Sequence, residues 1–185
     1  MACLIQFQFY QNNPRSFRDK LIANNAQINN IVSKVPSLHN FISRQKWFKK
    51  VIGIAKNRSL PQLQKQTLYD FYSNHTQSKS SRKVYLFCDE YTNYYDVGIG
   101  QKAILLLNNL GYEVLMVEHN ESGRAHISKG FLKSARALAN ANVKQFNSLV
   151  SQDIPLVGIE PSAILTFKDE YLRLADDKTS AEAIS

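Results

Sequence analysis

The sequence predicts an α/β protein in which a small, three-layer parallel sheet with crossover helices follows an α-helical segment. Apolar residues in the first 72 positions recur at spacings of three, four and seven, the period of amphipathic helices. From residue 84 onward, short apolar runs alternate with helix-like stretches, which favours parallel strands joined by right-handed crossovers. We therefore assign 1–72 to a basic helical segment, 73–83 to a polar linker, 84–174 to an α/β domain and 175–185 to a disordered tail.

The helical segment is expected to contain three helices. The first runs from Phe17 to Val35 and ends at Pro36, and the second spans residues 38–52 before Gly53. A short helix over residues 67–72 completes the segment. Each should bury one apolar stripe and leave its polar side in water.

Strands and helices alternate in the second part. In order, we expect a strand at 84–88, a helix at 99–110, a strand at 114–117, a helix that follows Ser128 and runs to 149, a strand at 155–159 and a helix at 163–171. Ser128 is the expected N-cap of the long helix, because serine readily caps helix N-termini. The carboxyl ends of parallel strands share one functional edge of the sheet. That edge should carry Asp89, Glu90, residues 118–124 and residues 160–162.

Charge divides the chain at the same point. Residues 1–83 carry 14 Lys and Arg against two acidic residues, a balance of +12, whereas residues 84–185 carry nine basic and 13 acidic residues, a balance of −4. Lys46, Lys49 and Lys50 are most simply the solvated face of a helix. The alternative is a docking surface for an acidic partner or for nucleic acid.

Composition excludes several classes of protein. A hydrophobic content of 44% suits one soluble domain, and no apolar run approaches the roughly 18 to 20 residues that span a bilayer. The first residues lack the pattern of a secretory signal. Cys3 and Cys88 are too few and too far apart for a disulfide framework. We expect a cytoplasmic setting, with membrane association only through partners.

A series of short motifs covers residues 83–171. They are Tyr91-Thr92-Asn93-Tyr94, Asp96-Val97-Gly98-Ile99-Gly100, Leu110-Gly111-Tyr112-Glu113-Val114, Ser122-Gly123-Arg124, Ile127-Ser128-Lys129-Gly130, Gly158-Ile159-Glu160-Pro161-Ser162 and Asp169-Glu170-Tyr171. In this order they resemble the cysteine-rich domain found in heterodisulfide reductase, in the iron–sulfur components of glycolate oxidase and anaerobic glycerol-3-phosphate dehydrogenase, and in fused FAD-linked oxidases. Leu21-Ile22-Ala23-Asn24 and Arg58-Ser59-Leu60-Pro61 are similar to the helical segment that precedes this domain in the fused enzymes.

The cysteines of that family are replaced here. Where cluster-binding members have Cys-Cys-Gly, this chain has Glu121-Ser122-Gly123, and where they have Pro-Ser-Cys it has Pro161-Ser162-Ala163. The upstream cysteine position falls near Glu90. Because iron–sulfur clusters need several converging thiolates, we expect no cluster and no catalysis in this chain. Cys88 is expected to point to another face and to be a small buried hydrophobe.

The glycine turn after the second strand offers a candidate anion site. A turn that leads into a helix presents backbone N–H groups to an anion, and nearby cations add charged donors for a small carboxylate or phosphate. The candidate residues are Ser122, Gly123, Arg124, Ser128 and Lys129. In the alternative interpretation Gly123 only permits the turn, and Arg124 pairs with Glu118, Glu121 or Glu160.

Two other groups of side chains invite functional interpretations. A carboxylate–imidazole metal site would use Asp89, His119, Glu121, His126 and Glu160. Their spacing matches no common metal signature, so we expect no metal. Tyr91, Tyr94 and Tyr95 have the chemistry to stack on a flavin or a base, but they are more simply packing between strand and helix.

The resemblance implies the C-terminal portion of a FAD-linked, iron–sulfur oxidoreductase of the 2-hydroxy acid dehydrogenase type, acting on a substrate such as lactate or glycolate. FAD and [4Fe-4S] clusters are then expected in the remainder of the parent protein, whose flavin and iron–sulfur domains are the partners of this docking or anion-binding domain. One alternative is a stand-alone domain that binds a redox partner. Nucleic-acid binding through the basic half ranks last, because no known reading module is present.

Overall fold

The computed structural model of the chain describes residues 2–77 and 79–185, so residue 1 of the helical segment and residue 78 of the expected linker lie outside it. The first part contains α1 (Ala2–Asn12), α2 (Phe17–Ala23), α3 (Asn25–Val32), α4 (Pro36–Arg44), α5 (Lys46–Val51) and α6 (Leu68–Asn74). The second part contains α7 (Glu90–Tyr94), α8 (Val97–Asn109), α9 (Arg124–Ser128), α10 (Leu132–Phe146), α11 (Pro161–Lys168), α12 (Tyr171–Leu174) and α13 (Lys178–Ala183). None of the described helices has the length and apolarity needed to cross a membrane.

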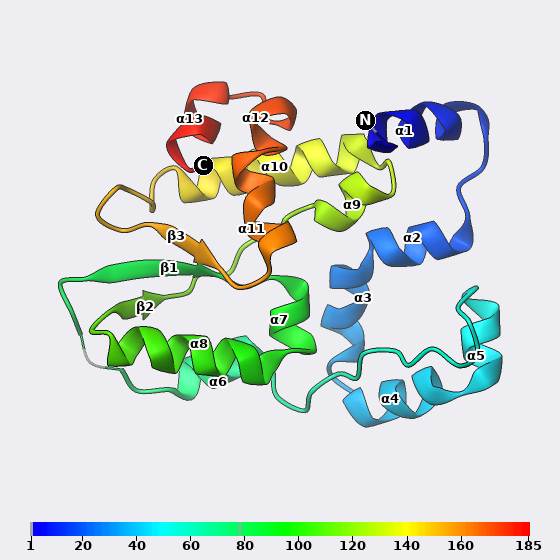
Figure 1. The fold of residues 1–185 in the computed structure, drawn as a ribbon, viewed down its shortest axis with the longest axis horizontal. Coiled ribbons are helices and arrows are strands. Elements are labelled where there is room, and N and C mark those ends of the chain that lie inside the picture. The colour runs from blue at the N-terminus through cyan, green and yellow to red at the C-terminus, as the bar shows by residue number, and fades with distance from the viewer. Residues whose placement is uncertain (1, 78) are drawn as a thin grey trace.

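Three parallel strands form the sheet, as the sequence predicts. They are β1 (Lys83–Phe87), β2 (Glu113–Leu115) and β3 (Leu156–Gly158), in the order β2-β1-β3. Tyr85 in the central strand lies opposite Leu115 of β2 and Leu156 of β3. Helices cover both faces of this sheet, and α1 to α5 lie to one side of it (Figure 1).

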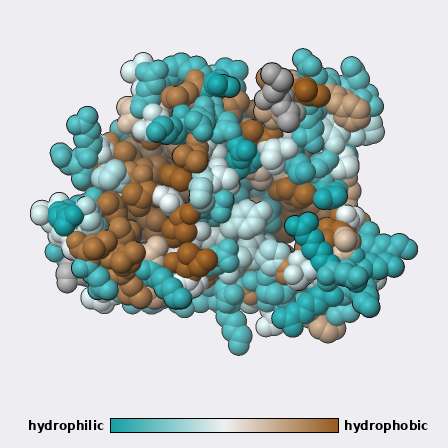
Figure 2. Space-filling view, viewed as in Figure 1, coloured by the Kyte–Doolittle hydropathy of each residue, from teal (hydrophilic) through white to brown (hydrophobic). Residues whose placement is uncertain are grey.

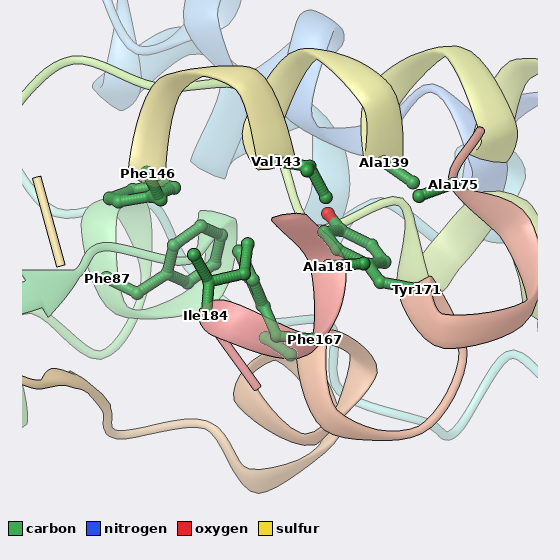
Figure 3. Packing of buried hydrophobic residues seen from close by; sticks show 10 residues of the cluster. Phe87, Ala139, Val143, Phe146, Phe167, Tyr171, Ala175, Ala181 and Ile184 are labelled. Carbon is green, nitrogen blue, oxygen red and sulfur yellow. The ribbon is translucent and has the colours of Figure 1, made fainter. Parts of the chain in front are cut away.

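The side chains of β1 alternate between two hydrophobic cores. Val84 and Leu86 pack with residues of α6 and α8 on one face, and Phe87 packs with α10 to α13 on the other. Figure 3 shows the second core, in which Phe87 meets Phe146 of α10 and Phe167 of α11. The three layers therefore follow from period-two alternation in a strand that is covered on both sides.

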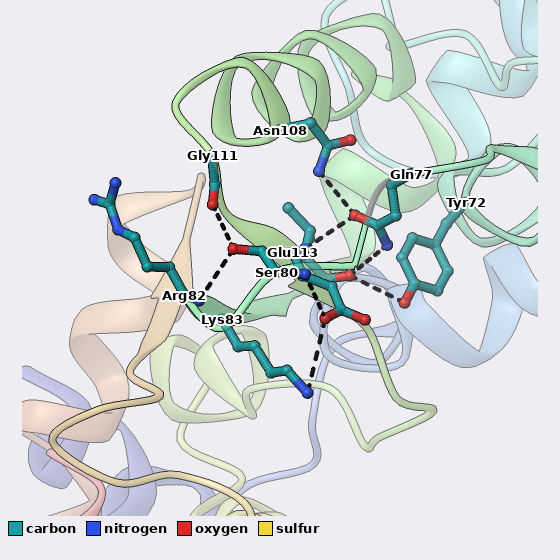
Figure 4. Close-up of polar contacts among 9 residues, drawn as sticks. Tyr72, Gln77, Ser80, Arg82, Lys83, Asn108, Gly111 and Glu113 are labelled. Carbon is teal, nitrogen blue, oxygen red and sulfur yellow. Dashed lines mark hydrogen bonds and ion pairs between the residues drawn. The ribbon is translucent and has the colours of Figure 1, made fainter.

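The predicted linker, residues 73–83, includes the end of α6 and the first residue of β1, and between them Gln77 and Ser80 form hydrogen bonds at the edge strand β2 and the turn before it. The Gln77 side chain accepts from the Val114 N–H (3.0 Å) and donates to the Val114 carbonyl (2.7 Å), which satisfies backbone groups on the strand's free edge. The Ser80 hydroxyl donates to the Gly111 carbonyl at 2.8 Å (Figure 4). Side-chain hydrogen bonds, which apolar periodicity does not reveal, order the described part of this connection.

The expectation of a disordered tail at 175–185 was wrong. Residues 178–183 form α13, and Asp177 caps this helix because its carboxylate accepts from the N–H and hydroxyl of Ser180. Ala181 and Ile184 are buried in the core beside Phe87. Two small apolar contacts and one cap are enough to order the tail, although the stretch is too short to show a helical period.

The predicted helix boundaries also needed correction. Ser128 is the last residue of α9 and does not cap α10, which begins at Leu132. Gly130 lies between these helices with a φ of +68°, a left-handed conformation that ends α9. The single helix expected from Phe17 is divided into α2 and α3, and Asn24 lies between them with non-helical φ and ψ.

Candidate functional site

The carboxyl end of β1 carries Asp89 and Glu90, as predicted. Asp89 is buried, and one of its oxygens accepts from the N–H groups of Tyr91 and Thr92 at 2.9 Å. Its other oxygen accepts from the Thr92 hydroxyl at 2.6 Å. These bonds make Asp89 the N-cap of α7, so its role is to direct the chain from the strand into the helix.

Glu90 and Glu121 form a buried carboxyl pair at this edge. Glu90 is 7% exposed, and the Glu121 side chain is 5% exposed. Burial raises the pKa of Glu90 to about 7, and the charges of Asp89 and Glu160 add to the rise. Burial and the charge of Glu90 raise the pKa of Glu121 to about 7 as well. One oxygen of each carboxyl has no hydrogen-bond partner among the described residues.

The two nearby histidines have different environments. The His126 ring is buried, with Nδ1 3.7 Å from a Glu121 oxygen, and burial lowers its pKa. In His119, Nε2 accepts from the Cys88 N–H and Nδ1 faces the Asn120 carbonyl at 2.8 Å, while the ring stacks on Phe87. Burial lowers the pKa of His119 to about 4, so this ring is neutral.

These side chains do not converge as metal ligands do. Among residues 2–77 and 79–185, no group of three or more His, Cys, Asp or Glu side chains is placed to hold a metal ion. Both ring nitrogens of His119 already face backbone groups. The Glu160 carboxylate accepts from the N–H and hydroxyl of Ser162 and begins α11. At this acidic edge, where the strands have their carboxyl ends, Asp89 and Glu160 therefore cap α7 and α11.

Tyr171 joins the turn after Glu121 to the helices behind it. Its hydroxyl donates to the Ser122 carbonyl at 2.9 Å and accepts from the Asn142 amide at 2.8 Å. The same amide donates to the Glu121 carbonyl at 2.9 Å. Asn142 was not singled out from the sequence, because a single amide inside an amphipathic helix carries no motif.

Three of the four expected cysteine positions, Glu90, Glu121 and Ser122, lie close together at this edge, and the fourth is Ala163 in α11. Glu90 and Glu121 are close enough to affect each other's ionisation, Ser122 is fully buried beside Glu121, and Ala163 lies in α11, which packs against α9. The Ser122 hydroxyl accepts from the Arg124 N–H at 3.2 Å. Two carboxyls, a hydroxyl and a methyl group do not fit an iron–sulfur cluster, because none supplies the thiolate that holds iron.

Cys88 does not replace the missing thiolates. It is buried with Val84 and Leu86 in the core beneath α8, as predicted for a small hydrophobe. Burial raises the pKa of its thiol, which disfavours the thiolate that binds metal. Contrary to expectation, Cys88 also lines the same cavity as Glu90.

The candidate anion site is occupied by internal contacts. Arg124 forms an ion pair with Glu170, and Lys129 pairs with Asp19 of α2 at 3.2 Å. The Ser128 hydroxyl donates to a backbone carbonyl in its own helix. Ion pairing of Arg124 was the alternative interpretation, but none of the three partners then considered is the one observed. Sequence gives no signal for this pair, because Glu170 follows 46 residues later, in the turn before α12.

An open cavity of about 750 Å³ lies between α3 and the acidic edge. Residues that line it include Asn30, Lys34, Glu90, Glu118, His119 and Glu121. None of the five candidate anion-binding residues lines it. Its unpartnered, buried oxygens belong to carboxyl groups, which repel a carboxylate ligand when ionised.

The tyrosine group packs α7 against the helical segment. The Tyr95 hydroxyl donates to Asn29 of α3 at 2.7 Å, and the rings of Tyr91 and Tyr95 lie 6.0 Å apart. Tyr94 lines the cavity. Packing was the expected role, but these contacts are between helices, not between a strand and a helix.

The fold and this edge define a small parallel α/β domain with a buried carboxyl pair where strand ends meet helices. The chain is similar to the D-2-hydroxyglutarate dehydrogenases of three bacteria. It is 28% identical to that of Pantoea ananatis over 174 residues, which cover 85% of this chain and 17% of the relative. It is 27% identical to that of Escherichia coli over 180 residues, which cover 89% of this chain and 18% of the relative. It is 26% identical to that of Haemophilus influenzae over 191 residues, which cover 93% of this chain and 18% of the relative.

The chain therefore spans less than a fifth of the length of these curated relatives. No protein-family model matches it, and no solved structure matches it. The names of the relatives agree with the expected class of oxidoreductase. The resemblance to the cysteine-rich domain stays a prediction.

Proposed function

We propose that this chain is a portion of a FAD-linked oxidoreductase of the D-2-hydroxy acid dehydrogenase type and acts there as a docking domain, not as a catalytic centre. The observation that carries this proposal is the similarity to D-2-hydroxyglutarate dehydrogenases along 85 to 93% of the chain. The oxidoreductase is a cytoplasmic enzyme, and its substrate is a 2-hydroxy acid.

The residues at the sheet edge support a non-catalytic role. Electron transfer needs a cofactor, and the expected cluster positions hold Glu90, Glu121, Ser122 and Ala163, which supply no thiolate. Arg124 and Lys129, the cations nearest the turn, already face carboxylates of this chain. FAD and iron–sulfur clusters are therefore carried by the remainder of the oxidoreductase, which is also the docking partner.

The test is to purify the protein from its source with an affinity tag on the chromosomal copy. We expect a flavin absorbance spectrum and a flavin-binding sequence, either in the same polypeptide or in one that co-purifies in equal amount. The purified material should reduce an artificial electron acceptor when given D-2-hydroxyglutarate, D-lactate or glycolate.

A 21.1 kDa chain that purifies alone, without flavin and without 2-hydroxy acid oxidation, would refute the proposal and favour a stand-alone domain. The L-enantiomers of the chiral acids are the matched control, because a specific dehydrogenase distinguishes the two hands of its substrate. Equal oxidation rates with the D- and L-enantiomers would argue against a D-2-hydroxy acid dehydrogenase.

A further inference from the structure

Helices α3, α4 and α5 have no fully buried apolar side chain. The fully buried residues of α3 and α4 are the polar Asn29 and Ser43, and α5 has no buried residue. Helices of soluble proteins normally bury their apolar stripe and expose the polar one. Here the apolar residues Ile28, Val32 and Ile42 are only partly buried.

Large apolar side chains of the same helices are exposed. Six of them lie between residues 31 and 51, and we call them the arm surface: Ile31, Val35, Leu38, Phe41, Trp47 and Val51. Trp47 is 61% exposed and Phe41 is 65% exposed. Neither hydrophobic core includes a residue of α1 to α5. The six apolar residues of the arm surface therefore do not serve to build a hydrophobic core within this chain.

Polar contacts hold the segment in place against the α/β domain. The Tyr95 hydroxyl donates to Asn29, and Lys129 pairs with Asp19. The Arg15 guanidinium donates to the carbonyls of Lys129 and Gly130 at 3.0 and 2.9 Å. The arm surface is thus presented in a fixed position, which lowers the entropy cost of binding a partner.

The segment that carries the arm surface is strongly basic. Residues 20–69 contain nine Lys and Arg and no Asp or Glu. Lys34, Arg44, Lys46 and Lys50 form no ion pair with any carboxylate in the described part of the chain. The view in Figure 2 shows mainly the hydrophilic side of α4 and α5. A partner for this surface must supply both apolar area and negative charge.

We propose that the arm surface docks against an apolar patch rimmed by carboxylates on the remainder of the oxidoreductase. The inference rests on the proposed function, since the relatives are more than five times longer than the matched region and provide the missing surface. An apolar centre with a charged rim is the usual anatomy of a protein interface. Exposed aliphatic side chains such as Leu38 and Val51 disfavour nucleic acid, which is bound through cations and stacking rings.

The test compares hydroxyl-radical footprints of the 185-residue chain and of the intact oxidoreductase purified as above. Mass spectrometry resolves single residues, and Trp47 is the single tryptophan of the chain. We expect Phe41 and Trp47 to react severalfold more slowly in the intact oxidoreductase. The double variant Phe41→Glu/Trp47→Glu should restore fast labelling of Leu38 and Val51.

Leu106→Glu is the matched control, because Leu106 is a leucine of α8 that is 59% exposed and lies outside the arm surface. Figure 2 shows apolar residues in brown over α8. This control should leave the footprint of Trp47 unchanged. A shift caused by Leu106→Glu and not by the double variant would place the interface on α8 and overturn the proposal.

The remaining outcomes separate the two proposals. A chain purified without any flavoprotein refutes both, whereas an intact flavoprotein in which Trp47 reacts as fast as in the 185-residue chain refutes the docking surface alone. Basic helices with exposed Trp and Phe also bind lipid surfaces. Binding of the chain to phosphatidylserine vesicles or to a DNA duplex, with Trp47 unprotected in the oxidoreductase, would likewise overturn the proposal.

Discussion

Replacing Glu90 by Gln tests whether the buried carboxyl pair destabilises the fold. Burial raises the pKa of Glu90 from its ordinary value of 4.5 to about 7, with further contributions from Asp89 and Glu160. Between these two pH values the folded protein keeps a proton that the unfolded chain releases. The contribution of Glu90 to stability is therefore greatest below pH 4.5 and declines as the pH rises to about 7.

The magnitude follows from the size of this pKa change. A rise from 4.5 to about 7 corresponds to about 3 kcal/mol of unfolding free energy lost at alkaline pH. Glutamine has nearly the same shape without the charge, but its buried amide leaves an unmet hydrogen bond that costs about 1 to 3 kcal/mol. That cost is the same at both pH values. The change in unfolding free energy caused by Glu90→Gln should thus be about 2 to 3 kcal/mol more stabilising at pH 8 than at pH 5.

Urea unfolding followed by circular dichroism at pH 5 and pH 8 measures this difference. Glu182→Gln is the control, because Glu182 is exposed in α13 and its loss of charge should change stability little at either pH. Removing the Glu90 charge should also lower the pKa of Glu121, which that charge raises. The reasoning is refuted if Glu90→Gln changes stability equally at the two pH values.

Three further predictions concern the turns and the cofactor. Tyr171→Phe removes the 2.9 Å bond to the buried Ser122 carbonyl and should lower the unfolding free energy by about 1 to 3 kcal/mol in urea titrations; no loss would contradict the role given to this bond. Gly130→Ala should lower the melting temperature, because its Cβ would lie 2.9 Å from the Phe7 nitrogen at a φ of +68°, whereas Gly98→Ala, with open space around it, should not. Anaerobic reconstitution with iron and sulfide should yield no stoichiometric thiolate-to-iron absorption, and such a band would overturn the argument from the missing cysteines.

Several features follow from residue pattern alone, because they depend on local order. Short apolar runs and helical spacing predicted the three strands and the long helices between them, and the carboxyl-end rule placed Asp89, Glu90 and Glu121 at one edge. The missing cysteines are visible directly in the sequence. Each of these inferences uses neighbours along the chain or a general rule of sheet geometry.

Contacts between distant residues were decided only by the tertiary structure. The pairing of Arg124 with Glu170, the docking of α13 into the core and the burial of the polar Asn29 and Ser43 leave no periodic signal. The apolar spacing predicted the helices near Ile31 and Phe41 but implied that these residues are buried, whereas they are exposed. A hydrophobic period shows that a helix has an apolar face, but what covers that face depends on how the rest of the protein packs.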